Sequence, residues 1–203
     1  EGILGLDEVS MSQSIKNFTT GSRQATGSTT SAAVTSEGAT SVALTVNSGA
    51  TIKAGDVFTV AGCNAVNPQT RESTGSLFQF VVLADVTASG TAVTVTVAPI
   101  YSSAHALATV DSLPANGQAV VFLGSASTGY AQNLVYHKDA IAFATADLLL
   151  PQGVDMASRA VHNGISMRVV RQYDINNDRM PCRVDVLYGY SVIRPQMACR
   201  VWG

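Results

Sequence analysis

Alternating acidic and amide side chains near the C-terminus are the first candidate for cation chemistry. Asp174, Asn176 and Asp178 alternate, and Asp185 occupies the twelfth position counted from Asp174, as in a calcium-binding loop. The sixth position, where the sharp turn of such a loop needs glycine, is Arg179, and a proline and a strand pattern follow instead of a helix. The two interpretations are a calcium loop and an Asn/Asp-rich hairpin turn, and the pattern favours the turn.

The three histidines are the next candidates, for metal binding or acid–base catalysis. His105, His137 and His162 are too far apart in sequence to form a zinc-ligand motif. A hydrolytic dyad of His137 with Asp139 or Ser125 is conceivable, but no G-x-S-x-G motif supports it. The alternative, which we favour, is that His137 helps to cap the start of a helix. No phosphate-binding motif occurs, so we expect no catalytic site, no metal and no cofactor.

Three cysteines, Cys63, Cys182 and Cys199, stand far apart without paired short spacing. Their odd number and spacing predict single buried thiols in a reducing compartment rather than a disulfide framework.

The segment 62–75 is long for a connection between two strands, and loops of this length are often functional. It carries the neighbouring charges Arg71 and Glu72 in an otherwise neutral stretch, with Asn64 and Asn67 before them. Contact with a neighbouring subunit suits this chemistry better than catalysis does, and an idle surface loop is the alternative. We therefore predict an intersubunit contact at Asn64, Asn67, Arg71 and Glu72.

Arginines and aspartates are interspersed after residue 160. The arginines at 168, 171, 183, 194 and 200 lie among the aspartates at 174, 178 and 185. A DNA-facing patch is one interpretation. Mixed signs at alternating strand positions favour the other, cross-strand or intersubunit ion pairs.

The overall composition bounds the class of protein. Of the 203 residues, 46% are hydrophobic and only 13% are charged, with a formal net charge of −2. This composition argues against disorder, and the lack of basic excess argues against a nucleic-acid-binding monomer. No apolar run is long enough to span a membrane. The chain starts without an initiator Met or signal peptide, so we expect it to be cut from a longer precursor.

The elements that position these residues fall into two regions. Residues 1–127 carry four basic and eight acidic side chains, and residues 128–203 carry eight basic and six acidic ones. After a Gly/Ser/Thr-rich stretch at 22–40, hydrophobic residues alternate with small or polar ones at 42–46, 57–61, 78–82 and 93–97, with a denser run at 120–123. Short strands separated by turn residues predict an antiparallel barrel or sandwich.

The second region is predicted to mix strands with a helix. The Ala-rich segment 138–147 favours a helix that ends before Pro151, and strands are expected near 133–137, 165–169, 182–186 and 197–201. The predicted fold class is therefore α+β.

Two long stretches of the sequence resemble a known family. Residues 133–154 (NLVYHKDAIAFATADLLLPQGV) and 165–203 (ISMRVVRQYDINNDRMPCRVDVLYGYSVIRPQMACRVWG) resemble the C-terminal part of coat proteins from short-tailed phages of the P-twenty-two type. Residues 54–82 (AGDVFTVAGCNAVNPQTRESTGSLFQFVV) resemble the domain inserted in that family.

This resemblance implies the C-terminal part of the HK-ninety-seven-like capsid shell fold, with a six-stranded antiparallel β-barrel inserted into it. By analogy, residues 1–21 are a core segment leading to the insertion, residues 22–127 are the inserted barrel, and residues 128–203 are the axial and peripheral core.

The function implied is a structural one, with no enzymatic activity. Such major capsid proteins self-assemble into the icosahedral shell that encloses phage double-stranded DNA. The implied partners are copies of the chain in hexamers and pentamers, a scaffolding protein during assembly, the portal at one vertex and, non-specifically at most, packaged DNA. The implied location is the virion, after assembly in the bacterial host cytoplasm. A tail-tube or decoration protein and a carbohydrate-binding β-barrel module are the alternatives.

Overall fold

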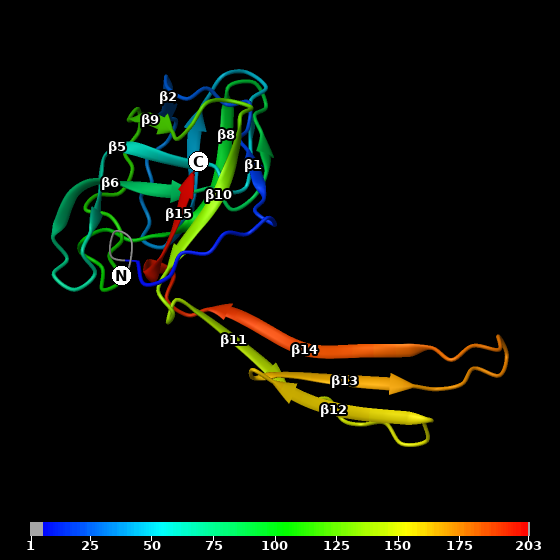
Figure 1. The fold of residues 1–203 in the computed structure, drawn as a ribbon. Coiled ribbons are helices and arrows are strands. Elements are labelled where there is room, and N and C mark those ends of the chain that lie inside the picture. The colour runs from blue at the N-terminus through cyan, green and yellow to red at the C-terminus, as the bar shows by residue number, and fades with distance from the viewer. Residues whose placement is uncertain (1–5, 203) are drawn as a thin grey trace. The chain divides into compact units, whose positions relative to one another are not determined.

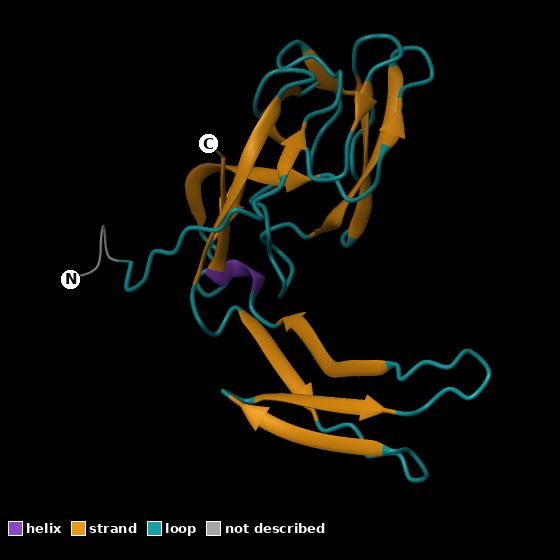
Figure 2. Ribbon diagram, turned by 45° about the vertical axis from the view of Figure 1, so that its right-hand side comes forward, coloured by secondary structure: helices purple, strands orange, loops and turns teal. Residues whose placement is uncertain are grey.

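The computed structural model describes residues 6–202, and β-strands dominate it (Figure 2). The strands are β1 (Asn17–Thr19), β2 (Ser28–Thr30), β3 (Ala39–Thr45), β4 (Thr51–Ile52), β5 (Val57–Val66), β6 (Ser73–Val81), β7 (Val86–Thr87), β8 (Ala92–Ile100), β9 (Ala119–Phe122), β10 (Gly129–Tyr136), β11 (Ile141–Ala146), β12 (Met156–His162), β13 (Ile165–Arg171), β14 (Cys182–Val192) and β15 (Ala198–Trp202). Helical structure in the described residues is limited to the 3₁₀ turn Pro195–Met197. None of these residues forms a helix of the length and hydropathy that crossing a bilayer requires.

The predicted α+β class is therefore wrong, because the described chain is almost entirely β-sheet. The segment 138–147 was expected to be a helix, yet its second half is strand β11, antiparallel to β14. In the register Ile141 faces Val192 and Phe143 faces Tyr190. The β-branched and aromatic residues that alternate with alanine fit a pleated strand, and their cross-strand partners outweigh the weak helix preference of the alanines.

The chain divides into two compact units. The first runs to Gln132 and also contains Trp202, and the second is Asn133–Val201. The boundaries at 21/22 and 127/128 implied by the resemblance remain predictions.

A six-stranded antiparallel sheet, in the order β6-β5-β9-β2-β3-β8, forms most of the first unit (Figure 1). The strands predicted by alternation near 42–46, 57–61, 78–82, 93–97 and 120–123 are confirmed as β3, β5, β6, β8 and β9. The sheet curls, and a backbone hydrogen bond from Leu83 N to Thr96 O (2.9 Å) links the chain after β6 to β8. This pairing is a curled sheet rather than a barrel closed by a continuous ladder.

The hydrophobic core lies inside this curl. The ring of Phe58 stacks on that of Phe80 at 5.3 Å between centroids and lies 5.5 Å from that of Phe122. These three side chains are buried, and burying each contributes about 2–3 kcal/mol by transfer from water. The aromatic residues of these strands are therefore core residues and not an exposed carbohydrate platform.

Two smaller sheets accompany the six-stranded one. β4 pairs with β7, and β1, β10 and β15 form a three-stranded sheet in the order β1-β10-β15. Phe18 pairs with Tyr130 in the register, and the Tyr130 ring stacks on Trp202 at 4.9 Å.

The second unit contains a four-stranded antiparallel sheet in the order β11-β14-β13-β12. The strands expected near 165–169 and 182–186 are confirmed as β13 and β14. Only Ala140 and Ser166 are buried among the side chains described in this unit. The sheet therefore lacks a core of its own in the described chain.

Candidate interaction surfaces

The predicted contact loop is a hairpin whose two strands reach much farther than the sequence indicated. β5 extends to Val66 and β6 begins at Ser73, so the turn comprises only residues 67–72. The register between these strands shifts twice, between Thr59 and Asn64 and again between Asn64 and Val66. Such irregularities absorb extra residues inside a ladder, which is why the alternating pattern is interrupted there.

Asn64 points its polar groups to a partner inside its own unit. Its backbone N and its Nδ2 donate hydrogen bonds to the two carboxylate oxygens of Asp111, at 2.8 and 2.7 Å, and its carbonyl accepts one from Asp111 N at 2.9 Å. Burial raises the pKa of Asp111, but the bonds from Asn64 and Ser112 outweigh it and lower that pKa below its usual value. This arrangement makes Asn64 an anchor of the hairpin.

Asn67 shapes the turn. Its Oδ1 accepts a hydrogen bond from Gln69 N at 2.9 Å, and its backbone groups bond to Arg71 N and Glu72 O. Arg71 has a positive φ of 59°, and the side chains of Arg71 and Glu72 are both exposed, with no ion pair between them in the described structure. Of the four predicted residues, only these two present free charged groups at the hairpin tip.

A larger surface, which the sequence analysis missed, lies on one face of the β11-β14-β13-β12 sheet. Side chains alternate between the two faces of a strand, so the register decides which residues share a face. Phe143 pairs with Tyr190, and Met167 pairs with Val186. We define the apolar face by its exposed members, which are Phe143, Met167, Val184, Val186, Tyr188, Tyr190 and Val192.

The exposure of this face is unusual for a sheet. Tyr190 is 76% exposed and Val184 is 61% exposed, although antiparallel sheets normally bury one of their faces. Phe143 and Tyr188 stack on each other at 6.1 Å, yet both remain exposed. Contiguous exposed apolar surface of this kind marks an interaction site. The sequence shows the alternating apolar residues along β14, but it does not indicate that they stay exposed in the part of the chain that the structure describes.

The opposite face of the same sheet carries an ion pair between the two central strands, β13 and β14. Arg168 and Asp185 are cross-strand partners and form an ion pair in which Arg168 Nε donates at 3.1 Å, and Arg183 binds the same carboxylate. The bonds from Arg168, and after them those from Arg183, lower the pKa of Asp185. Arg171, at the end of β13, pairs with Asp155 at 3.2 Å, but the register places Arg171 on the same face as Met167. The predicted cross-strand ion pairing is confirmed for Arg168 and Asp185.

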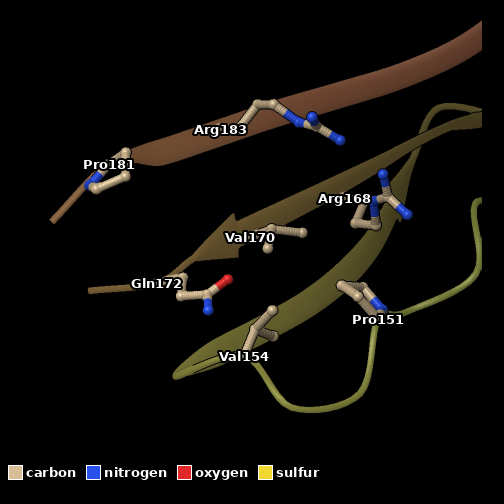
Figure 3. Close-up of a pocket in the computed structure, with 7 residues that line it drawn as sticks. All are labelled: Pro151, Val154, Arg168, Val170, Gln172, Pro181 and Arg183. Atoms are coloured by element: carbon tan, nitrogen blue, oxygen red, sulfur yellow. The ribbon is translucent and has the colours of Figure 1, made fainter. Parts of the chain in front are cut away.

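An open groove of about 360 Å³ lies on this charged face (Figure 3). Its lining is mainly apolar, and the two arginines that share Asp185 border it. Its lining residues are Pro151, Val154, Arg168, Val170, Gln172, Pro181 and Arg183.

The remaining candidates from the sequence occupy turns. Asp174 forms an antiparallel bridge with Arg179, and its carboxylate accepts hydrogen bonds from Asn176 N (3.0 Å) and Asn177 Nδ2 (2.7 Å). This geometry confirms the hairpin turn. The bond from the Asn177 side chain, and then that from Asn176 N, lower the pKa of Asp174.

His137 caps a turn rather than a helix, so that detail of the prediction is wrong. Its Nδ1 accepts a hydrogen bond from Asp139 N at 3.3 Å, and the strand β11 follows. Ser125 donates its backbone N–H to Tyr130 Oη at 2.8 Å. Within residues 6–202 no three His, Cys, Asp or Glu side chains gather as a metal-ligand cluster.

The cysteines occupy different environments. Cys63 is buried, whereas Cys182 and Cys199 are exposed, so the expectation of three buried thiols is correct only for Cys63. Burial, and next the charge of Asp111, raise the pKa of Cys63 to about 11.

Comparison with known proteins agrees with the family resemblance in the sequence. A family model described as "P22 coat protein - gene protein 5" matches residues 5–202. A protein named "Major capsid protein" from Acyrthosiphon pisum secondary endosymbiont phage 1 is 30% identical over 161 residues, which are 75% of this chain. The chain spans 38% of the length of that relative. The match to the family model extends through both compact units, and the chain belongs to the P22 coat protein family.

Proposed function

We propose that this chain is part of a structural major capsid protein that self-assembles into the icosahedral shell around phage double-stranded DNA. The observation that carries the proposal is the apolar face, which is too exposed for a subunit that works alone. Family membership supports the same conclusion. No catalytic step is proposed for any residue.

The partners follow from this role. The chain would contact copies of itself in hexamers and pentamers, a scaffolding protein during assembly and the portal at one vertex, with packaged DNA contacted non-specifically at most. Its location would be the virion, after assembly in the cytoplasm of the bacterial host. We also propose that the β5–β6 hairpin tip at Arg71 and Glu72 contacts a neighbouring subunit, because its exposed charges have no partner in the described chain.

Polar substitution on the apolar face tests the main proposal. The complete coat polypeptide carrying Val184→Ser and Tyr190→Ser is expressed with its scaffolding protein, and products are examined by sedimentation and negative-stain microscopy. We expect at least about a tenfold loss of closed shells, because two exposed apolar anchors are removed from the contact.

Leu187→Ser is the matched control, since Leu187 lies on the same strand but faces the other way and is 47% exposed. We expect shells to form normally with this control. Wild-type yields of closed shells from the double variant would refute a role for the apolar face in assembly.

A further inference from the structure

A buried ion pair lies where the chain enters and leaves the six-stranded sheet. The side chains of Arg23 and Asp56 have no exposed surface, and Arg23 Nη2 lies 3.2 Å from Asp56 Oδ1. Arg23 lies between β1 and β2, and Asp56 immediately precedes β5. Burying two charges is costly, and such a pair rarely adds net stability over apolar residues of similar volume. The consequence of this ion pair is geometric, since it holds the segment between β1 and β2 against the start of β5.

The guanidinium of Arg23 also holds the outgoing chain. Nη2 donates to the carbonyl of Leu123 at 2.7 Å, and Nη1 donates to the carbonyl of Gly124 at 3.1 Å. The same guanidinium lies over the ring of Phe122, 4.9 Å from its centroid. One side chain thus connects the incoming segment, the carboxylate of Asp56 and the end of β9.

The second carboxylate oxygen of Asp56 is bonded both to the incoming segment and to the turn before β5. Its Oδ2 accepts hydrogen bonds from Gly21 N at 3.2 Å and from Lys53 N at 2.8 Å. A Cβ at position 21 would lie 2.1 Å from Thr51 O, so only glycine fits this close approach.

A second layer of bonds joins the incoming and outgoing backbones directly. Thr20 N donates to Thr128 O at 3.1 Å, Thr20 Oγ1 donates to Ser125 O at 2.6 Å, and Ser127 N donates to Gly21 O at 3.0 Å. These bonds continue into the β1–β10 pairing, in which Thr19 faces Gly129.

We propose that Arg23 and Asp56 form a lock that joins the six-stranded sheet rigidly to the β1–β10 pair. The sheet and the strand pair then unfold in one cooperative step. The chain segments at this neck are then a fixed joint and not a flexible linker. The argument rests on the guanidinium, because this side chain of the incoming segment bonds both to the buried carboxylate and to two carbonyls of the outgoing chain.

Hydrogen exchange in the unmodified chain tests the lock first. The amides of Thr20 and Ser127 report the neck, and the amides of Thr30 and Val46, bonded to Gln118 O and Thr91 O, report the six-stranded sheet. A lock predicts the same protection factor, within about threefold, for both sets, because they open in one cooperative unit. Neck amides that exchange more than about tenfold faster than the sheet amides would overturn the proposal.

A double variant then separates the joint from the stability of the sheet. Arg23→Met with Asp56→Leu replaces the buried pair by apolar side chains, which proteins often tolerate. We expect exchange at Thr20 and Ser127 to rise at least about tenfold relative to Thr30 and Val46, although the direct acceptors of these amides are unchanged. The exposed pair Arg159 and Asp147, substituted in the same way, is the control and should leave the ratio unchanged.

Arg23→Lys keeps the positive charge but cannot reach the carboxylate and both carbonyls at once. We expect the same change in the exchange ratio to a smaller extent. An unchanged ratio in this variant or in the double variant would refute the lock.

Discussion

At the scale of single residues, the sequence shows where an amide side chain stands but not which group it bonds to. Asn64 and Asn67 are both on the β5–β6 hairpin and were predicted to serve the same contact. The structure separates them, since Asn64 binds the carboxylate of Asp111 and Asn67 binds a backbone N–H of its own turn. Asp111 is distant in sequence, and periodicity carries no information about such a partner.

This difference predicts distinct pH dependences for two similar variants. The lowered pKa of Asp111 means that its interactions add stability above the pKa of the unfolded carboxyl, about 3.9, and lose it as pH falls through the folded value. Asn64→Ala is expected to lower the free energy of unfolding by about 1 kcal/mol at pH 7, a value discounted for partial exposure. The loss should shrink as the pH falls through the lowered pKa of Asp111 and the carboxylate is protonated.

Asn67→Ala is the control, because its side chain binds no carboxylate and its effect should vary little with pH. Urea titrations at pH 7 and at successively lower pH measure both variants. A loss for Asn64→Ala that is as large in acid as at neutral pH would contradict the role given to Asp111.

At the scale of elements, alternation predicts the strands of the first unit correctly. The prediction fails where a strand period competes with the helix preference of alanine. In 141–146 the odd positions, such as Phe143, follow a strand period, while the alanines between them favour a helix. The pairing of β11 with β14 decided the outcome, and that partner lies some 45 residues away, beyond the reach of local propensity. The long loop at 62–75 was misjudged for a related reason, because bulges interrupt the alternation of a continuous hairpin.

The tip of that hairpin carries a prediction of its own. Arg71→Asn with Glu72→Gln removes both exposed charges, and asparagine tolerates the positive φ at position 71. We expect shell yield to fall at least about threefold, because rim charges set subunit encounter and register, while the melting temperature changes by less than about 2 °C. Light scattering during assembly and thermal unfolding of the unassembled protein measure the two effects. Equal impairment of both would place the charges in an intradomain role.

At the scale of the whole chain, composition and charge suggested two regions, and the structure has two compact units. The charge-poor first unit supports itself with a continuous core. Among its described residues the second unit has no such core. This absence could not be predicted from alternating apolar residues, because the pattern is the same whether a neighbour covers them or not. The alternating pattern therefore predicts strands β13 and β14 correctly but carries no information about the surface that they form.

This contrast predicts that the second unit is stabilised by assembly. A sheet with few buried side chains opens at low free energy, so amides of β12, β13 and β14 should exchange faster in the unassembled protein than those of β3, β5 and β8. Shell formation should slow exchange in β13 and β14 by at least about a hundredfold, because a partner that covers the apolar face removes the local opening.

Exchange measured by mass spectrometry on peptides from free and assembled protein compares the two states, with β3 and β8 as internal references already protected by their core. If β13 and β14 are as protected in the free protein as the core strands are, the second unit does not depend on a partner. If assembly leaves their exchange unchanged, the apolar face is not covered in the shell.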